Sequence, residues 1–249
     1  MNVGALMKES AAKGQVLLAF LLDPEKTTGK ALDLWITEAN RAKPDLIFVG
    51  GSQLHQSVES SVSALKRQLT IPVVLFPGHP SQFSDNADAL LLLSLISGRN
   101  AELLIGQQVQ SARVIEQSGI EVLSVGYMLI DGDKKTAVER ISLTKSLDPQ
   151  NVDLIVDTAL AGQQLGLQYI YLEAGSGAKR PVSPSVIKAV KSYLHIPLIV
   201  GGGIKTPEGL QLAYSSGADI VVIGNHLETY PEEMVLFSQA HQKNTLEPK

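Results

Sequence analysis

Short apolar runs alternate with longer amphipathic stretches along most of this chain. Eight such runs occur, namely VLLAFLLDP, DLIFVGGS, PVVLFPG, DALLLLSLISG, EVLSVGYML, QYIYLEAGSG, PLIVGGG and DIVVIGN. They lack the regular alternation of apolar and polar residues that marks a strand with one face in water. We therefore expect buried strands that are covered on both faces, as in a parallel sheet.

The stretches between these runs have helical periodicity. Residues 28–42, TGKALDLWITEANRA, are one example, and residues 183–194, SPSVIKAVKSYL, are another. The second opens with Ser183 as a helix N-cap and Pro184 at the first helical position. Eight strands that alternate with helices predict an α/β fold, a closed (β/α)8 TIM barrel, as a single domain over residues 1–249. An open doubly wound sheet is the alternative.

Two segments interrupt the alternation. Residues 131–151, DGDKKTAVERISLTKSLDPQN, are too long and too polar for an ordinary connection. They predict a functional loop over the barrel mouth. Residues 76–88, FPGHPSQFSDNAD, leave little room for a helix between the third and fourth strands. We expect a short or irregular element there.

Composition excludes several classes of function. The 249 residues include no cysteine, so a disulfide framework, a thiolate nucleophile and a zinc-thiolate site are excluded. A net charge of -4 gives no basic excess, which argues against nucleic acid as a partner. The polar start of the chain does not have the pattern of a signal peptide, and the apolar runs fall short of the ~18 residues that span a bilayer. We expect a cytoplasmic protein without a membrane span.

The loops after the seventh and eighth runs are rich in glycine. In (β/α)8 barrels these two loops frequently hold phosphate. Gly201–Gly203 leave main-chain N–H groups open to an anion, and a helix that begins near Thr206 adds its positive end. Gly224 and Asn225 serve in the same way one strand later. Tight turns are the alternative interpretation, but the pairing of the two loops favours phosphate. Walker A and Rossmann fingerprints are absent, so a nucleotide is not favoured.

Two apolar runs end in polar groups that suit a metal ion. Asp23 ends the first run and would lie at the barrel mouth, where a carboxylate suits Mg²⁺. Gly50 and Gly51 bring Ser52 to the same opening after the second run. A helix-starting turn at Asp23 and a plain turn at Ser52 are the alternatives.

The sixth run ends in a carboxylate, Glu173. Apolar surroundings raise the pKa of such a group towards the value that a general base needs near neutral pH. A core acid satisfied by the main chain or by one lysine is the alternative. The basic pair that follows, Lys179 and Arg180, is interpreted as loop charge facing solvent.

Six motifs, in this order and spacing, closely resemble the geranylgeranylglyceryl phosphate synthase family, which includes bacterial heptaprenylglyceryl phosphate synthases. They are LLDPEK, VGGS, GYML, YLEAGSGAKRPV, VGGGIKTPEG and DIVVIGN, and the resemblance runs from about Val16 to Asn225. It implies a Mg²⁺-dependent prenyltransferase. Such an enzyme forms an ether bond between a polyprenyl diphosphate and the C3 hydroxyl of sn-glycerol 1-phosphate, and releases diphosphate.

The same resemblance implies the site residues. Asp23 and Ser52 match the metal ligands near the diphosphate. The substrate-binding positions are Tyr171, Leu172, Glu173, Ala174, Gly175, Ser176 and Gly177 for glycerol phosphate, with Gly202, Gly203, Gly224 and Asn225 at its phosphate. Glu173 is expected to orient and deprotonate the attacking hydroxyl. For the prenyl tail, we expect an apolar groove around Leu92, Leu95 and Tyr127.

Several alternatives stay open at this point. The heptaprenyl branch of the family tends to carry Lys two residues before the metal Asp, where this chain has Leu21. Together with the long 131–151 segment, this favours geranylgeranyl diphosphate, with heptaprenyl transfer as the alternative. A sugar-phosphate isomerase or aldolase barrel and a non-catalytic barrel that binds phospho-ligands or lipid are further alternatives. Apolar helix faces and the resemblance suggest a homo-oligomer, with transient membrane contact for a lipid product.

Overall fold

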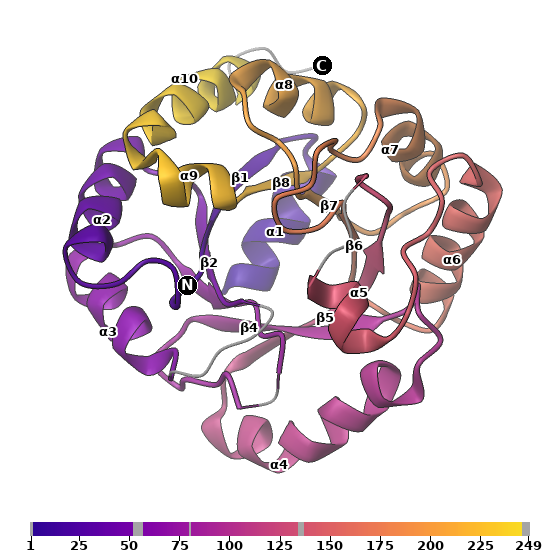
Figure 1. Cartoon of the computed structure of the whole chain (residues 1–249), viewed down its shortest axis with the longest axis horizontal. Coiled ribbons are helices and arrows are strands. Elements are labelled where there is room, and N and C mark those ends of the chain that lie inside the picture. Colours follow the sequence, from indigo (N-terminus) through magenta and orange to yellow (C-terminus); the bar gives the residue numbers. More distant parts are fainter. Residues whose placement is uncertain (1, 52–56, 80, 134–136, 246–249) are drawn as a thin grey trace.

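A closed barrel of eight parallel strands forms the centre of the protein (Figure 1). The computed structural model describes residues 2–51, 57–79, 81–133 and 137–245. Each strand pairs with the next along the chain, and β8 pairs with β1. The strands are β1 (Leu17–Leu22), β2 (Leu46–Val49), β3 (Val73–Leu75), β4 (Ala89–Leu95), β5 (Glu121–Leu129), β6 (Tyr169–Glu173), β7 (Leu198–Gly201) and β8 (Ile220–Ile223). The (β/α)8 prediction is confirmed, and the open sheet is excluded.

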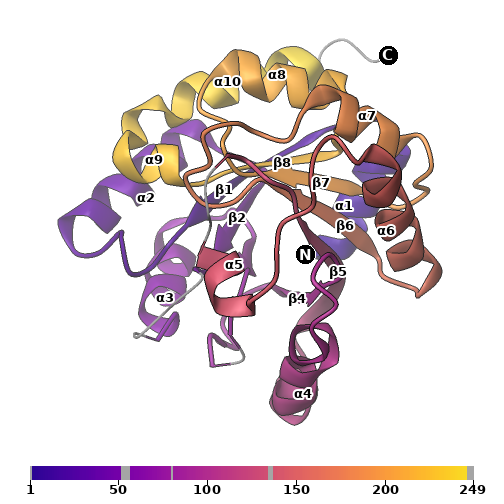
Figure 2. The same cartoon turned by 45° about the vertical axis from the view of Figure 1, so that its right-hand side comes forward.

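Helices surround the barrel (Figures 1 and 2). They are α1 (Val3–Ala12), α2 (Lys30–Ala42), α3 (Glu59–Gln68), α4 (Gln107–Ser118) with a π-helical turn before it (η1, Glu102–Gly106), α5 (Ala137–Ser142), α6 (Val152–Gln164), α7 (Pro184–Lys191), α8 (Pro207–Ser215), α9 (Asn225–Thr229), a 3-10 turn (η2, Pro231–Glu233) and α10 (Met234–Thr245). Helix α7 begins as expected, because Ser183 Oγ accepts a hydrogen bond from the Val186 N–H (3.4 Å). No helix lies between β3 and β4 in the part of that segment that the structure describes.

Side chains of each strand alternate between two cores. In β6, Tyr169 and Tyr171 point into the barrel, whereas Ile170 and Leu172 pack in the layer between the strands and the helices. All four residues are fully buried. Because both faces of the strand are covered, the sequence of a strand is apolar throughout and shows no alternation.

Helix α1 closes the barrel at the amino-terminal ends of the strands. Its residues Val3 and Met7 join the core inside the barrel. The main-chain N–H groups of Val3 and Gly4 donate to the two carboxylate oxygens of Glu121, the first residue of β5, at 2.7 and 2.9 Å. A carboxylate at the start of a helix accepts hydrogen bonds from its free N–H groups and interacts favourably with the positive end of the helix dipole. The opposite end of the barrel is therefore the open one.

The long connection between β5 and α6 passes over this open end and contains α5 (Figure 2). Ile130 forms an isolated parallel bridge with Leu147. The main-chain N–H of Arg180 donates to Gly132 O at 3.3 Å, and its guanidinium pairs with Asp133. Arg180, interpreted above as a loop charge in solvent, is exposed but thus also ties the loop after β6 to this connection.

None of the helices formed by the described residues combines the length and apolar character that crossing a bilayer requires.

Candidate functional site

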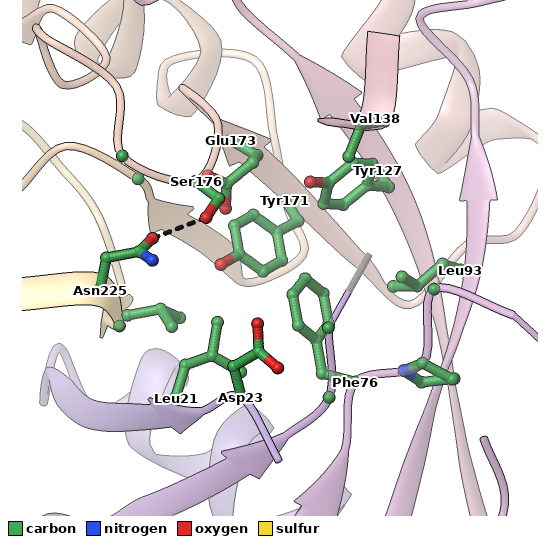
Figure 3. Close-up of a pocket in the computed structure, with 18 of the residues that line it drawn as sticks. Leu21, Asp23, Phe76, Leu93, Tyr127, Val138, Tyr171, Glu173, Ser176 and Asn225 are labelled. Atoms are coloured by element: carbon green, nitrogen blue, oxygen red, sulfur yellow. Dashed lines mark hydrogen bonds between the residues drawn. The ribbon is translucent and has the colours of Figure 1, made fainter. Parts of the chain in front are cut away.

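A cavity of about 170 Å³ opens at the carboxyl ends of the strands. Figure 3 shows Ser176 and Asn225 on one side of it and Phe76 and Leu93 on the other, with Leu21 and Asp23 between them. The polar half consists of Glu173, Ser176, Gly177, Gly202, Gly203, Gly224 and Asn225. The apolar half consists of Phe76, Leu93, Leu95, Leu103, Tyr127 and Val138. The site is therefore suited to a ligand, or a pair of ligands, with one polar and one apolar part.

Glu173 ends β6 in the polar half and is 6% exposed. Its Oε1 accepts a hydrogen bond from the Gly175 N–H at 2.7 Å. Burial raises the pKa of Glu173 to about 7, while the Gly175 N–H and the nearby Tyr171 hydroxyl act in the opposite direction. The carboxyl group therefore gains and loses its proton near neutral pH, which is the property that a general base requires.

Tyr171 lies two residues earlier on β6 and is fully buried. Its ring stacks on Phe76 and meets Tyr127 edge-on, both with ring centroids 5.4 Å apart. Burial, together with the nearby charge of Glu173, raises the pKa of Tyr171 well above its usual value. The hydroxyl lies near the Glu173 carboxylate, but it makes no hydrogen bond of good geometry with the described residues. Because a buried hydroxyl without a partner is unfavourable, this oxygen is a natural contact for a polar atom of a ligand.

The last residue of β7, Gly201, and the two glycines that follow it make room for the β6 segment. A Cβ on Gly201 would overlap the Tyr171 hydroxyl, and one on Gly202 would overlap Glu173 Oε1. A Cβ on Gly203 would lie 2.9 Å from the Pro181 nitrogen. Gly202 and Gly203 also have positive φ angles of 79° and 72°. The lack of side chains at these glycines therefore allows the β6 segment to pack closely against them, in addition to leaving main-chain N–H groups open.

A chain of polar contacts links the polar half to the loop after β1. Ser176 Oγ donates to Asn225 Oδ1 at 2.7 Å, and Asn225 Nδ2 donates to Glu228 Oε2 at 3.1 Å (Figure 3). Lys26 Nζ lies 3.5 Å from the same Glu228 oxygen and 2.7 Å from Asp23 Oδ2. Burial raises the pKa of Glu228, against the attraction of Lys26. Lys26 and Glu228 were not predicted as site residues, although Lys26 ends the motif LLDPEK and Glu228 lies three residues after DIVVIGN.

Asp23, the predicted metal ligand, borders the same cavity. Its side chain is 13% exposed, and a Cβ on Gly51 would lie 2.8 Å from Asp23 Oδ1, so the glycine keeps space open beside this oxygen. Ser52 lies outside the described residues. Within the described part of the chain, no cluster of three or more His, Asp or Glu side chains is suited to a metal. A single carboxylate at the cavity fits Mg²⁺, which binds one or two protein groups and otherwise keeps water and substrate phosphates.

Some predicted residues face away from the cavity. Leu172 and Ala174 pack in the layer between strands and helices, so only their main chain is available to a ligand. Leu95 and Tyr127 line the cavity as expected, but the placement of Leu92 in the same groove is wrong. Leu92 packs outside the barrel and borders a separate cavity of about 40 Å³. It is three positions from Leu95, and side chains of a strand alternate between its faces.

Fold and cavity together define a (β/α)8 barrel with a ligand site at the carboxyl ends of its strands. The sequence profile of the PcrB family matches residues 12–240. A geranylgeranylglyceryl phosphate synthase from Flavobacterium johnsoniae is 48% identical over 221 residues, which cover 88% of this chain and 91% of that protein. One from Thermofilum pendens is 39% identical over 210 residues, covering 84% and 81%.

A solved structure gives the same result. The crystal structure of (S)-3-O-geranylgeranylglyceryl phosphate synthase from Thermoplasma acidophilum, in complex with substrate sn-glycerol-1-phosphate, superposes with a TM-score of 0.91 and 30% identity. The superposition covers 98% of this chain and 99% of that one. The chain therefore belongs to the PcrB family of geranylgeranylglyceryl phosphate synthases, and the resemblance seen in its motifs is confirmed.

Proposed function

We propose that this protein is a geranylgeranylglyceryl phosphate synthase. It joins geranylgeranyl diphosphate to the C3 hydroxyl of sn-glycerol 1-phosphate through an ether bond and releases diphosphate. The observation that carries the proposal is the division of one cavity into a polar half and an apolar half. The names of the similar proteins, and the sn-glycerol-1-phosphate bound in one of them, support it.

In this proposal the polar half binds glycerol phosphate. The phosphate contacts the loops of Gly202, Gly203, Gly224 and Asn225, and helix α8 contributes its positive end. Tyr171 and the segment up to Gly177 surround the glycerol part, with the unpaired Tyr171 hydroxyl as a hydrogen-bond partner. Fixing the attacking hydroxyl next to the allylic carbon is worth several kcal/mol, about 7 to 11 in the best model systems.

Glu173 is the proposed general base. As the C3 oxygen forms its bond to the first carbon of the prenyl chain, the diphosphate leaves with the electrons of the broken C–O bond. Glu173 takes the proton that the hydroxyl loses. A pKa of about 7 allows the carboxyl to be partly ionised before the reaction and to hold the proton afterwards.

Mg²⁺ is the proposed cofactor, with Asp23 and Ser52 as its protein ligands. When bound, it supplies positive charge that stabilises the departing diphosphate. The Asp23 carboxylate, which borders the cavity beside Gly51, supports this part of the proposal.

The apolar half is the proposed site of the prenyl chain. Phe76, Leu93 and the ring of Tyr127 form an apolar wall across the cavity from Asn225 (Figure 3). A sugar phosphate would need polar partners on that side, so this wall favours a prenyl substrate over the isomerase and aldolase alternatives. Transfer of a heptaprenyl group is the alternative within the family. Homo-oligomeric assembly and a cytoplasmic location stay predictions from the sequence.

A direct assay tests the function. Purified protein is incubated with Mg²⁺, sn-glycerol 1-phosphate and prenyl diphosphates of several lengths, and the ether product is identified by mass spectrometry. We expect product with geranylgeranyl diphosphate, and we expect Asp23→Ala to abolish it. Absence of product at every prenyl length, together with isomerase or aldolase turnover, would overturn the proposal.

A further inference from the structure

Lys26 is a charged residue of the cavity that the mechanism above does not use. It follows β1, and its ammonium lies between two carboxylates, 2.7 Å from Asp23 Oδ2 and 3.5 Å from Glu228 Oε2. Its side chain is 48% exposed, whereas those of Asp23 and Glu228 are 13% and 8% exposed. The ammonium therefore neutralises two largely buried acids and still reaches the open part of the cavity.

The position of Lys26 creates a competition at Asp23. The carboxylate that is proposed to bind Mg²⁺ already pairs with the lysine through Oδ2, and two cations a few ångströms apart on one carboxylate repel each other. When Mg²⁺ binds Asp23, the ammonium loses its shorter contact. It keeps Glu228, which the Asn225 amide holds through a hydrogen bond of 3.1 Å.

A diphosphate carries more negative charge than a single Mg²⁺ neutralises. Among the described residues that line the cavity, the lysines are Lys26 and Lys205. Lys205 follows the glycines of the polar half, whereas Lys26 lies beside Asp23, where the metal and the diphosphate would meet. A lysine ammonium provides three hydrogen-bond donors that suit phosphate oxygens.

We propose that Lys26 exchanges partners during substrate binding. It neutralises Asp23 until Mg²⁺ arrives and then binds the diphosphate of the prenyl substrate, while Glu228 keeps its ammonium at the edge of the cavity. This assignment rests on the proposed function, and it makes Lys26 a binding residue for the leaving group.

Two binding titrations without turnover test the exchange. The first measures Mn²⁺ alone, as a spectroscopic substitute for Mg²⁺, by the electron paramagnetic resonance of free Mn²⁺. Lys26→Met removes the competing cation, so we expect Mn²⁺ to bind about twofold to fivefold more tightly, the scale of a partly exposed ion pair. The second measures inorganic pyrophosphate at saturating Mg²⁺ by calorimetry. Here we expect Lys26→Met to weaken binding about tenfold or more, because a charge-assisted hydrogen bond is lost.

The opposite signs separate this role from a structural one, since a distorted site would weaken both ligands. Lys30→Met is the matched control, because it removes the same charge at a residue that is exposed at the start of α2 and does not line the cavity. It should leave both titrations at wild-type values. Lys26→Arg keeps the positive charge and should restore most of the pyrophosphate affinity.

The exchange is overturned if Lys26→Met fails to tighten Mn²⁺ binding or fails to weaken pyrophosphate binding. If the wild-type protein binds pyrophosphate and forms the ether product, such a result removes only the role of Lys26. If the wild-type protein binds neither pyrophosphate nor sn-glycerol 1-phosphate and forms no product, the proposed function fails with it.

Discussion

Carboxylates at the two ends of the barrel have opposite surroundings. At the amino-terminal end, Asp45, Asp88 and Asp219 each directly precede a strand. Each accepts a hydrogen bond from a main-chain N–H at 2.7 Å, donated by Leu18, Val73 and Leu198 respectively. Each also lies within 2.9 Å of a nitrogen of His241, Lys66 or Lys191. These acids have a main-chain donor and a basic side chain as partners, so they serve the fold.

At the carboxyl-terminal end, the acids line the cavity, and their partners differ. Glu173 has a main-chain donor but no cationic partner among the described residues, and its pKa is raised to about 7. Asp23 accepts a hydrogen bond from the Glu25 N–H at 3.1 Å and pairs with Lys26, but the side chain of this lysine is half exposed at the cavity. Position at the end or at the start of a strand thus separates acids that are available for chemistry from acids that stabilise the barrel. Changing one acid at a time tests this division.

After the loss of product expected for Asp23→Ala, the next largest effect is expected from Glu173→Gln. The amide has nearly the same shape but cannot take a proton, so kcat should fall by a factor of about 10² to 10⁴. The affinity for sn-glycerol 1-phosphate, measured by calorimetry, should change little. An equal loss in affinity and in kcat would make Glu173 a binding residue and not a base.

The same substitution should change the pH dependence of stability. The pKa of Glu173 is raised from 4.5 in the unfolded chain to about 7 in the folded protein, so folding takes up a proton between these pH values. Burial costs no charge when the carboxyl is protonated in both states, so the contribution of this acid to stability is greatest below pH 4.5. The protein loses this contribution as the pH rises to about 7. Relative to Glu173→Gln, the wild-type protein should lose up to about 3 kcal/mol over this interval.

Urea denaturation of both proteins at a series of pH values measures this difference. A constant difference between pH 4.5 and pH 7 would show that burial does not shift the pKa of this acid.

Asp219→Ala should affect the fold and not the chemistry. It removes the acceptor of the Leu198 N–H and leaves Lys191 without its partner. We expect the free energy of unfolding to fall by about 2 kcal/mol, while kcat stays near the wild-type value. Asp219→Asn keeps an acceptor oxygen and should lose less. A drop in kcat comparable to that of Glu173→Gln would show that the two ends of the barrel are not functionally separate.

Much of the fold follows from local features of the sequence. Eight apolar runs predict eight strands, and carboxyl ends of parallel strands meet at one edge, which brings Asp23 and Glu173 to one cavity. The contact between Lys26 and Glu228 joins segments from opposite ends of the chain and has no local signal. The overlap that a Cβ on Gly201 would make with Tyr171 likewise depends on the register of β6 and β7.

The error at Leu92 has a different origin. Strand β4 reads ALLLLSL, with leucine at neighbouring positions, so its composition does not mark which residues face the barrel interior. Both faces are apolar because helices cover the outer one. Only the alternation of side chains, counted from a residue whose direction is known, resolves the assignment.

The smallest effect is expected from a substitution in β4, where two neighbouring leucines can be compared. Leu93 lines the apolar half, whereas Leu92 packs outside the barrel. Leu93→Ala removes apolar surface that the prenyl chain would contact, so KM for geranylgeranyl diphosphate should rise about fivefold, corresponding to about 1 kcal/mol. Its KM for sn-glycerol 1-phosphate should not change, because that substrate occupies the polar half. Leu92→Ala is the matched control and should leave both KM values unaltered. If Leu92→Ala raised KM for the prenyl substrate as much as Leu93→Ala, the prenyl chain would bind outside the barrel and not in the apolar half.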